Sequence, residues 1–192
     1  MLLCLNLTAA TAQLFAGTLT CPSPACVGRL RPWGHARPRR LRDGHSYRPR
    51  RGRCRSCTRT QVIGWSNSYP RRVDHVNIVG EALQAAARGH GYRRVAEIVD
   101  RPASTVRDWI HRARRNSEPV RVGATVYTYA LDPVAYQFDP TGTTLGDMLD
   151  AVGRAVQARA LRFGSPDAGI WQRVLVLTRG AILAPVHRRI VS

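Results

Sequence analysis

The sequence predicts a mainly α-helical fold with a small β module near its N-terminus. Three observations support this prediction: cysteines in two close pairs bracket short, turn-rich segments, apolar residues recur at helical spacing over 76–115, and further apolar stretches of helical length follow. The 192 residues are 44% hydrophobic, which is enough for buried cores. We therefore expect an N-terminal helix within 1–17, a cysteine module over 18–65, a three-helix core over 74–116 and C-terminal helices over 117–192.

The first residues, MLLCLNLTAATAQLF, predict a short helix from Ala9 to Ala16 with Thr8 as its N-cap and Gly17 as its end. Cys4 is interpreted as a small apolar residue of this helix. The segment lacks the basic start of a signal peptide, and polar residues interrupt its apolar run. The chain has no stretch of 18 uninterrupted apolar residues, so we expect no membrane span and a cytoplasmic location.

The charge is large and unevenly distributed. The chain has 30 basic residues, all of them arginine, and a net charge of +18. Residues 29–72 hold fourteen arginines and a single acid, Asp43. A run of charge is often only a solvated surface, but so many like charges repel one another strongly unless a polyanion neutralises them. The composition therefore favours nucleic acid as a partner, and guanidinium groups bind phosphate and guanine well.

The cysteine module has two turn-prone loops. One is CPSPAC, with Cys21 and Cys26, and the other is CRSC, with Cys54 and Cys57. The intervening residues predict short strands that Asp43-Gly44 turns into a hairpin. We expect these strands over Gly28–Gly34, Arg37–Arg42 and Ser46–Arg53.

Two cysteine pairs on such loops are typical of a tetrahedral zinc site, with the four thiolates as ligands. His35 and His45 lie between the pairs and are alternative ligands, although four cysteines already complete the shell. The competing interpretation is that the thiols are unrelated buried side chains. A module of this size buries too little apolar surface to fold alone, so a bound metal would supply folding free energy.

Apolar spacing predicts three helices after the cysteine module. Glycines end the first, and Arg101-Pro102 separates the second from the third. The inner faces hold Val76, Val79, Leu83 and Ala86 or Ala87 in the first helix, Val95, Ala96 and Val99 in the second, and Val106, Trp109, Ile110 and Ala113 in the third. The outer face of the third holds Ser104, Thr105, Arg107, Asp108, His111 and Arg112. An ordinary amphipathic hairpin with solvated charges is the alternative.

Two segments resemble known families. RGRCRSCTRTQVI looks like the second knuckle of the zinc ribbons that open many insertion-sequence transposases. GYRRVAEIVDRPASTVRDWIHRARR is similar to the helix-turn-helix of sigma-factor region 4 and of transposases. Together with GRLRPWGHARPRR, the chain resembles an uncharacterised actinobacterial family with a domain of unknown function.

The helix-turn-helix resemblance implies roles for individual residues. Ser104 and Thr105 match positions that often touch phosphate, and Arg107 and Asp108 match positions that often reach base edges. We expect His111 and Arg112 to lie on the same DNA-facing surface. The ribbon is expected to add phosphate contacts, through the arginines Arg50, Arg51 and Arg53.

The last third is predicted to be helical. Ser117-Glu118-Pro119 is interpreted as a helix start and Asp132-Pro133 as its end, with the next helix running from Thr144 to Phe163. Residues 170–184 are apolar nearly all round and predict a helix that is either buried in the chain or in contact with a second copy. A homodimer through these helices and an intrachain core both stay open.

Catalysis is not expected. The chain shows no phosphate loop, HExxH motif or Ser/His/Asp group. A transposase active site needs three well-placed carboxylates, whereas the acids of the last third look like caps or surface residues. These acids are Asp132, Asp139, Asp147, Asp150 and Asp167.

The sequence thus favours a sequence-specific protein that binds double-stranded DNA, a transcriptional regulator related to transposase DNA-binding regions. Two alternatives stay open, an adaptor that docks on the transcription machinery and an accessory or truncated transposase.

Overall fold

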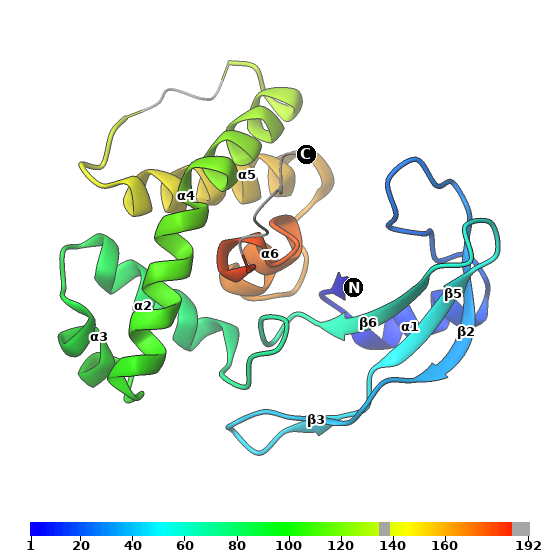
Figure 1. Cartoon of the computed structure of the whole chain (residues 1–192). Helices are drawn as coiled ribbons and strands as arrows, with labels where there is room; N and C mark the ends of the chain where they lie inside the picture. The colour runs from blue at the N-terminus through cyan, green and yellow to red at the C-terminus, as the bar shows by residue number, and fades with distance from the viewer. Residues whose placement is uncertain (135–138, 186–192) are drawn as a thin grey trace, which may run out of the picture. The chain divides into compact units, whose positions relative to one another are not determined.

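The computed structural model describes residues 1–134 and 139–185 and divides into two compact units (Figure 1). We call Met1–His75 the N-terminal unit and Val76–Ser192 the helical unit. Among the described residues there are six α-helices, and the sheets lie in the N-terminal unit, as the predicted fold class requires.

The N-terminal unit is built on a four-stranded sheet with the strand order β1-β6-β5-β2. Its strands are β1 (Leu2–Cys4), β6 (Thr60–Trp65), β5 (Arg50–Cys54) and β2 (Leu30–His35). β1 runs parallel to β6, whereas β5 is antiparallel to both neighbours. A separate hairpin pairs β3 (Arg39–Arg40) with β4 (Ser46–Tyr47) and turns at Asp43-Gly44, as predicted, with φ of 90° at Gly44. The longer strands expected for this region are each shorter in the structure.

The first helix, α1 (Leu7–Phe15), begins two residues earlier than predicted. Asn6, not Thr8, is its N-cap, because the Asn6 side chain accepts a hydrogen bond of 2.8 Å from the Ala9 backbone N–H. Cys4 was expected in this helix but lies in β1, where its thiol donates to the Gly64 carbonyl at 3.2 Å. β1 forms because it pairs with β6, which lies sixty residues later in the chain. The sequence around Cys4 gives no local signal of this partner.

α1 packs on one face of this sheet. Leu14, Leu30 and Ile63 are fully buried there. A Cβ on Gly52 of β5 would lie 2.9 Å from the Leu14 side chain, so the glycine permits the close approach of α1. Since side chains alternate along a strand, the neighbours Arg51 and Arg53 point to the opposite face.

The helical unit begins with the three expected helices, α2 (Val76–Ala87), α3 (Tyr92–Ile98) and α4, which starts at Ala103. Gly89, with φ of 94°, follows the first helix, and Pro102 is the N-cap of α4 rather than its first residue. The predicted inner faces are confirmed except for Ala87, which is half-buried where its alternative, Ala86, is buried. The buried members are Val76, Val79, Leu83, Ala86, Val95, Ala96, Val99, Val106, Trp109, Ile110 and Ala113.

α4 is a single helix, Ala103–Leu131, of 29 residues. The expectation that a new helix starts at Ser117 is wrong, and the boundary expected at 116/117 falls inside α4. Pro119 lies within the helix and deprives one carbonyl of its helical donor. The helix nevertheless continues, because Ser117, Val120, Ala124 and Thr128 extend its buried face, along which α4 packs against α5.

α5 (Thr144–Phe163) matches the predicted helix and ends at Gly164, with φ of 85°. Its N-cap is Thr143, whose hydroxyl accepts from the Gly146 backbone N–H at 3.0 Å. Residues 170–184 were expected to form one helix, but they do not. They form α6 (Ile170–Leu177), a turn through Gly180 with φ of 76°, and the 3₁₀ helix η1 (Ala181–Leu183).

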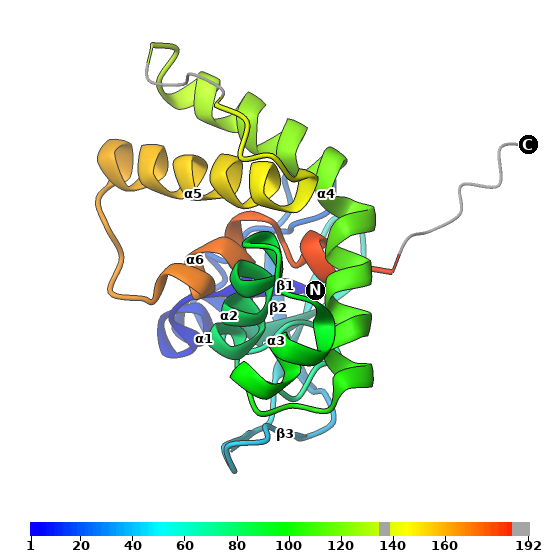
Figure 2. The same ribbon diagram turned by 90° about the vertical axis from the view of Figure 1, so that its left-hand side faces the viewer.

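Figure 2 shows α5 beside α4, and α6 contacts both α5 and α2. Trp171 of α6 lies so close to Gly80 of α2 that a Cβ on this glycine would overlap the indole ring. No helix of the described residues is both long enough and apolar enough to span a membrane.

Candidate metal centre and nucleic-acid interface

The four predicted metal ligands come together in the N-terminal unit. The Sγ atoms of Cys21, Cys26, Cys54 and Cys57 all lie within 4.8 Å of one another. Cys21 and Cys57 are 3.7 Å apart, and Cys26 and Cys54 are 3.6 Å apart. A tetrahedral site with metal–sulfur bonds of about 2.3 Å has sulfur–sulfur distances of about 3.8 Å. The Cys21–Cys57 and Cys26–Cys54 pairs therefore already have the separation that a thiolate-bound divalent ion needs, and the other sulfurs lie within 4.8 Å of one another.

Backbone hydrogen bonds hold the two loops in this position. The Cys21 N–H donates to the Gly28 carbonyl at 2.8 Å, and the Cys54 N–H donates to the Arg59 carbonyl at 3.0 Å. Each loop also contains a residue with positive φ next to a cysteine, Ala25 at 57° and Thr58 at 58°. Tight loops of this kind direct two sulfurs toward a common point.

Gly28 lets the loops approach. A Cβ at this position would lie 2.7 Å from the Cys54 sulfur and 2.5 Å from the Ser56 hydroxyl. Any side chain would therefore push the second cysteine pair away from the first. The sequence predicts Gly28 only as the start of a strand, and no local signal marks its role beside Cys54.

The electrostatics of the cluster favour a cation. The backbone N–H of Cys57 lowers the pKa of Cys54 to about 6. The N–H of Gly28 also acts to lower the pKa of Cys26, but desolvation and the neighbouring thiols together raise it to about 11. Sulfurs this close repel one another once ionised, and a bound divalent ion removes that repulsion. The chemistry of the donor set therefore suits a metal ion.

The two histidines between the cysteine pairs are not part of this cluster. His35 is exposed on β2, and its pKa is lowered by desolvation and by the charges of Arg50 and Arg48. His45 is exposed in the β3–β4 turn, with Nδ1 3.6 Å from an oxygen of Asp43.

The arginines of β2 and β5 lie on both faces of the sheet. Arg50 lies on the α1 side, with its guanidinium 5.1 Å from the centre of the Phe15 ring. Arg53 lies on the other face, 4.7 Å from the Trp33 ring centre, and Arg31, its cross-strand partner, lies 5.4 Å from the same ring. This face of the sheet thus carries two cations close to one aromatic ring.

Arg31 and Trp33 were missed by the sequence reasoning. Both lie in β2, away from the arginine run at Arg50, Arg51 and Arg53. The alternation of Arg31 and Trp33 along a strand was the available signal, but their contact with Arg53 depends on strand pairing.

In the helical unit, the start of α4 presents the predicted outer face. Ser104, Arg107 and His111 are exposed, whereas Thr105 and Arg112 are half-buried. Trp109, on the inner face, is fully buried, as expected for a core residue rather than a stacking platform.

Asp108 and Arg112 are partners along α4. The Arg112 Nε donates to both carboxylate oxygens of Asp108, at 2.9 and 3.0 Å. Asp108 is therefore already engaged in the unbound protein, and it orients Arg112. Arg107 makes no hydrogen bond or ion pair with any residue that the structure describes, so its guanidinium is free for a ligand.

A homeodomain-like domain family matches residues 79–121. The match spans α3, α4 as far as residue 121, and most of α2. A helix-turn-helix of this kind indicates DNA binding. No curated protein and no solved structure matches the chain.

Further basic and aromatic residues border the exposed face at the start of α4. A hollow of about 260 Å³ lies between the start of α3 and α4, where His90 and Tyr92 meet Arg107, His111 and Arg114. His90, Tyr92 and Arg114 were not among the predicted contacts. His90 and Tyr92 lie outside the third helix, and only the packing of α3 against α4 brings them beside Arg107.

Proposed function

We propose that this chain is a sequence-specific DNA-binding protein, a transcriptional regulator related to transposase DNA-binding regions. The observation that carries the proposal is the helix-turn-helix of residues 79–121, whose third helix buries Trp109 and exposes Arg107. In this proposal, the start of α4 enters the major groove. Such a protein would act in the cytoplasm, where it meets DNA.

Arg107 is the proposed base-reading residue. Its unpaired fork matches the two acceptors on the major-groove edge of guanine, a contact that contributes about 1–3 kcal/mol of discrimination. Ser104, one turn before Arg107, and Thr105 are proposed to bind phosphate, and His111 lies one turn after Arg107 on the same face.

The ribbon is proposed to bind the phosphate backbone. Arg31 and Arg53 lie close to the ring of Trp33 on one face of the sheet, and Arg51 points to the same face. Such contacts give salt-dependent affinity without base preference. Arg50 lies on the other face beside Phe15, so we assign it a weaker share.

The metal is proposed to be zinc. A four-cysteine shell with loops of this kind is typical of structural zinc sites, in which the ion supplies folding energy and no chemistry. The cysteine cluster is the one group of three or more candidate metal ligands within residues 1–134 and 139–185. We propose that the chain has a binding role rather than a catalytic one, as the sequence led us to expect.

A homodimer through the C-terminal helices is a further proposal. Val122, Val126 and Tyr129 recur at helical spacing on α4 and are 46%, 64% and 44% exposed. Dimers of helix-turn-helix proteins read two half-sites one helical turn apart. Sedimentation of the Val126→Glu variant tests this, because a dimer through α4 would dissociate and a monomer would be unaffected.

The test of DNA recognition is selection of bound sequences from a random duplex pool, followed by titration across salt. Arg107→Ala should flatten preference at one base position, whereas Arg31→Ala with Arg53→Ala should weaken all duplexes alike and lower the salt slope by about 2. Arg162→Ala, which removes one positive charge from the exposed end of α5, is the matched control for Arg107→Ala. An unchanged base preference in Arg107→Ala would show that this residue does not read DNA.

A further inference from the structure

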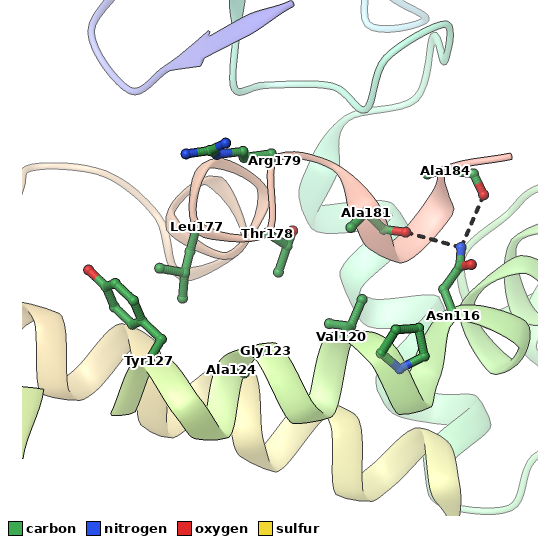
Figure 3. A pocket seen from close by; sticks show the side chains of 11 residues that line it. Asn116, Val120, Gly123, Ala124, Tyr127, Leu177, Thr178, Arg179, Ala181 and Ala184 are labelled. Carbon is green, nitrogen blue, oxygen red and sulfur yellow. Dashed lines mark hydrogen bonds between the residues drawn. The ribbon is translucent and has the colours of Figure 1, made fainter. Parts of the chain in front are cut away.

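In the helical unit, α4 borders hollows of different chemistry. The larger, of about 480 Å³, lies between the middle of α4 and the segment from α6 to η1 (Figure 3). Gly123 and Leu177 help to line it, and the amide of Asn116 at its edge already donates to the carbonyls of Ala181 and Ala184. This lining is mostly apolar, so it does not by itself indicate a ligand.

The smaller hollow, of about 260 Å³, is lined by basic and polar side chains. His90 and Tyr92 come from the start of α3 and the turn before it, and Arg107, His111 and Arg114 come from successive turns of α4. Residues three or four apart are neighbours on one helix face, so these α4 side chains lie side by side. None of the described residues that line the hollow is acidic. The hollow therefore gathers positive charge.

The neighbouring acids are occupied by other arginines. An oxygen of Glu97, in α3, lies 2.8 Å from Nη1 of Arg94, and an oxygen of Asp108, in α4, lies 2.9 Å from Nε of Arg112. Neither acid lines the hollow. The charge of the hollow is therefore not neutralised by the carboxylates of the two helices that form it.

The basic side chains of the hollow are also unpaired. His90, Arg107, His111 and Arg114 are exposed, and within the described ranges their side chains have no hydrogen-bond or ion-pair partner. Several unpaired donors around one hollow suit an anion with several acceptor oxygens. A phosphate of the DNA backbone is such an anion, and the hollow adjoins Arg107, the proposed base-reading residue.

We propose that this hollow binds one phosphate of the DNA backbone and that protonation of His90 and His111 strengthens the contact, so that DNA affinity rises as the pH falls. The inference rests on the proposed DNA-binding function and adds a pH response to it. Imidazole is the side chain whose charge ordinarily changes between pH 5 and pH 8, whereas arginine stays charged and tyrosine neutral. The two histidines are therefore the lining residues that respond to pH.

The direction of the response follows from the chemistry of imidazole. The neutral ring has one N–H donor and no charge, whereas the protonated ring has two donors and a positive charge. A phosphate in the hollow therefore favours the protonated form. DNA binding then takes up protons, so affinity is highest at low pH and falls as the pH rises.

The test is fluorescence anisotropy of a rhodamine-labelled DNA duplex of random sequence, titrated with the full-length protein between pH 6 and pH 8 at constant ionic strength. Affinity should be about tenfold higher at pH 6, the effect of one or two charge-assisted hydrogen bonds to phosphate. The logarithmic salt slope should steepen by about 2 when both imidazoles are charged. Metal content is measured at both ends of the range, because protons compete for thiolate ligands.

Double variants of the two histidines identify the titrating groups. His90→Gln with His111→Gln should lose the gain in affinity between pH 8 and pH 6. His90→Arg with His111→Arg should bind as tightly at pH 8 as at pH 6, because its charge is permanent. His45→Gln is the matched control, since His45 is exposed in the β3–β4 turn beside Asp43 and does not line the hollow. This control should keep the tenfold response.

The outcomes separate this inference from the proposed function. DNA binding with equal affinity at pH 6 and pH 8 would overturn the inference alone, whereas no DNA binding at either pH would overturn both. A full pH response in the double glutamine variant, or its loss in His45→Gln, would place the titrating groups elsewhere and would also overturn the inference.

Inorganic phosphate distinguishes a backbone phosphate from a free ion. Titrated by calorimetry without DNA, it should give no heat of binding up to about 1 mM, because it lacks the other contacts of the duplex. Tight binding of the free ion would contradict a site that serves DNA.

Discussion

The N-terminal unit buries few apolar side chains, whereas the helical unit buries many, drawn from all of its helices. The main core cluster of the N-terminal unit has seven buried members, and two of them are the metal-ligand candidates Cys21 and Cys54. The helical unit fully buries Val76, Leu83, Trp109 and Met148, among others. We therefore expect the first unit to depend on its sulfur cluster for stability and the second to be stable without it.

The same contrast extends to DNA. The N-terminal unit carries most of the excess arginine and places cations on an exposed sheet face, which suits backbone contacts. The helical unit carries less charge but presents a helix start, which suits base contacts. We thus propose that the N-terminal unit positions the protein on the DNA backbone and that the helical unit reads the bases. A variant that damages one unit should leave the DNA contacts of the other measurable.

The largest expected effect is that of Cys54→Ser. The variant should lose its metal and with it folding energy on the order of 10 kcal/mol, so the N-terminal unit should unfold. Hydrogen exchange should rise throughout residues 1–75 and stay unchanged in α2–α5. Metal content and hydrogen-exchange mass spectrometry measure this outcome.

Cys4→Ser is the matched control for this variant, because Cys4 lies in β1 outside the cluster and its donor to Gly64 is retained. It should keep a full equivalent of metal. A Cys54→Ser protein with intact protection in the N-terminal unit would contradict the metal-dependent fold.

Trp109→Ala is the opposite experiment. Removing this fully buried ring should cost the helical unit about 3–5 kcal/mol, while metal content stays at one equivalent. Trp109→Phe should cost much less, since the indole N–H has no hydrogen-bond partner among the described residues. Thermal unfolding followed by circular dichroism gives the comparison, and an equal loss in both variants would argue against a packing role.

Gly28→Ala should weaken the metal site without removing a ligand. The added methyl would lie 2.7 Å from the Cys54 sulfur, so the loops must separate. We expect a loss of about 10- to 100-fold in metal affinity, as for other changes that displace ligands indirectly. Competition with a chromophoric chelator measures it. Gly91→Ala, where the new Cβ meets open space, should show the parent affinity.

The smallest effect is expected for Gly123→Ala. The alanine should stabilise the helical unit by about 0.5–1 kcal/mol, because it improves helix propensity and meets no neighbour. Chemical denaturation monitors the change. Destabilisation would mean that this glycine is needed for packing.

Local patterns in the sequence were sufficient for several features. The spacing of Val76, Leu83, Val106 and Trp109 placed three helices correctly, because amphipathic periodicity reports burial directly. The loops CPSPAC and CRSC indicated a common sulfur cluster, because paired cysteines on tight turns are typical of metal sites. Gly164 marked the end of α5 for a local reason, its positive φ.

The errors have a common cause. Ser117-Glu118-Pro119 has the composition of a helix start, but the buried stripe through Val120 and Ala124 carries α4 past the proline. The sequence around Cys4 has no local feature of a strand, and Cys4 lies in a strand because β1 pairs with β6. In both cases packing against a distant segment outweighed the local preference.

By itself, the sequence determined the fold class, the cysteine cluster and the helix-turn-helix, since each depends on residues that are neighbours along the chain or on one helical face. Only the tertiary structure decided that Arg31, Trp33 and Arg53 share a sheet face, that Gly28 meets Cys54, and that Gly123 and Leu177 line one hollow. These contacts join residues far apart in the chain. Strand register and helix packing create them, and both are set by the burial of the whole unit rather than by any local run of residues.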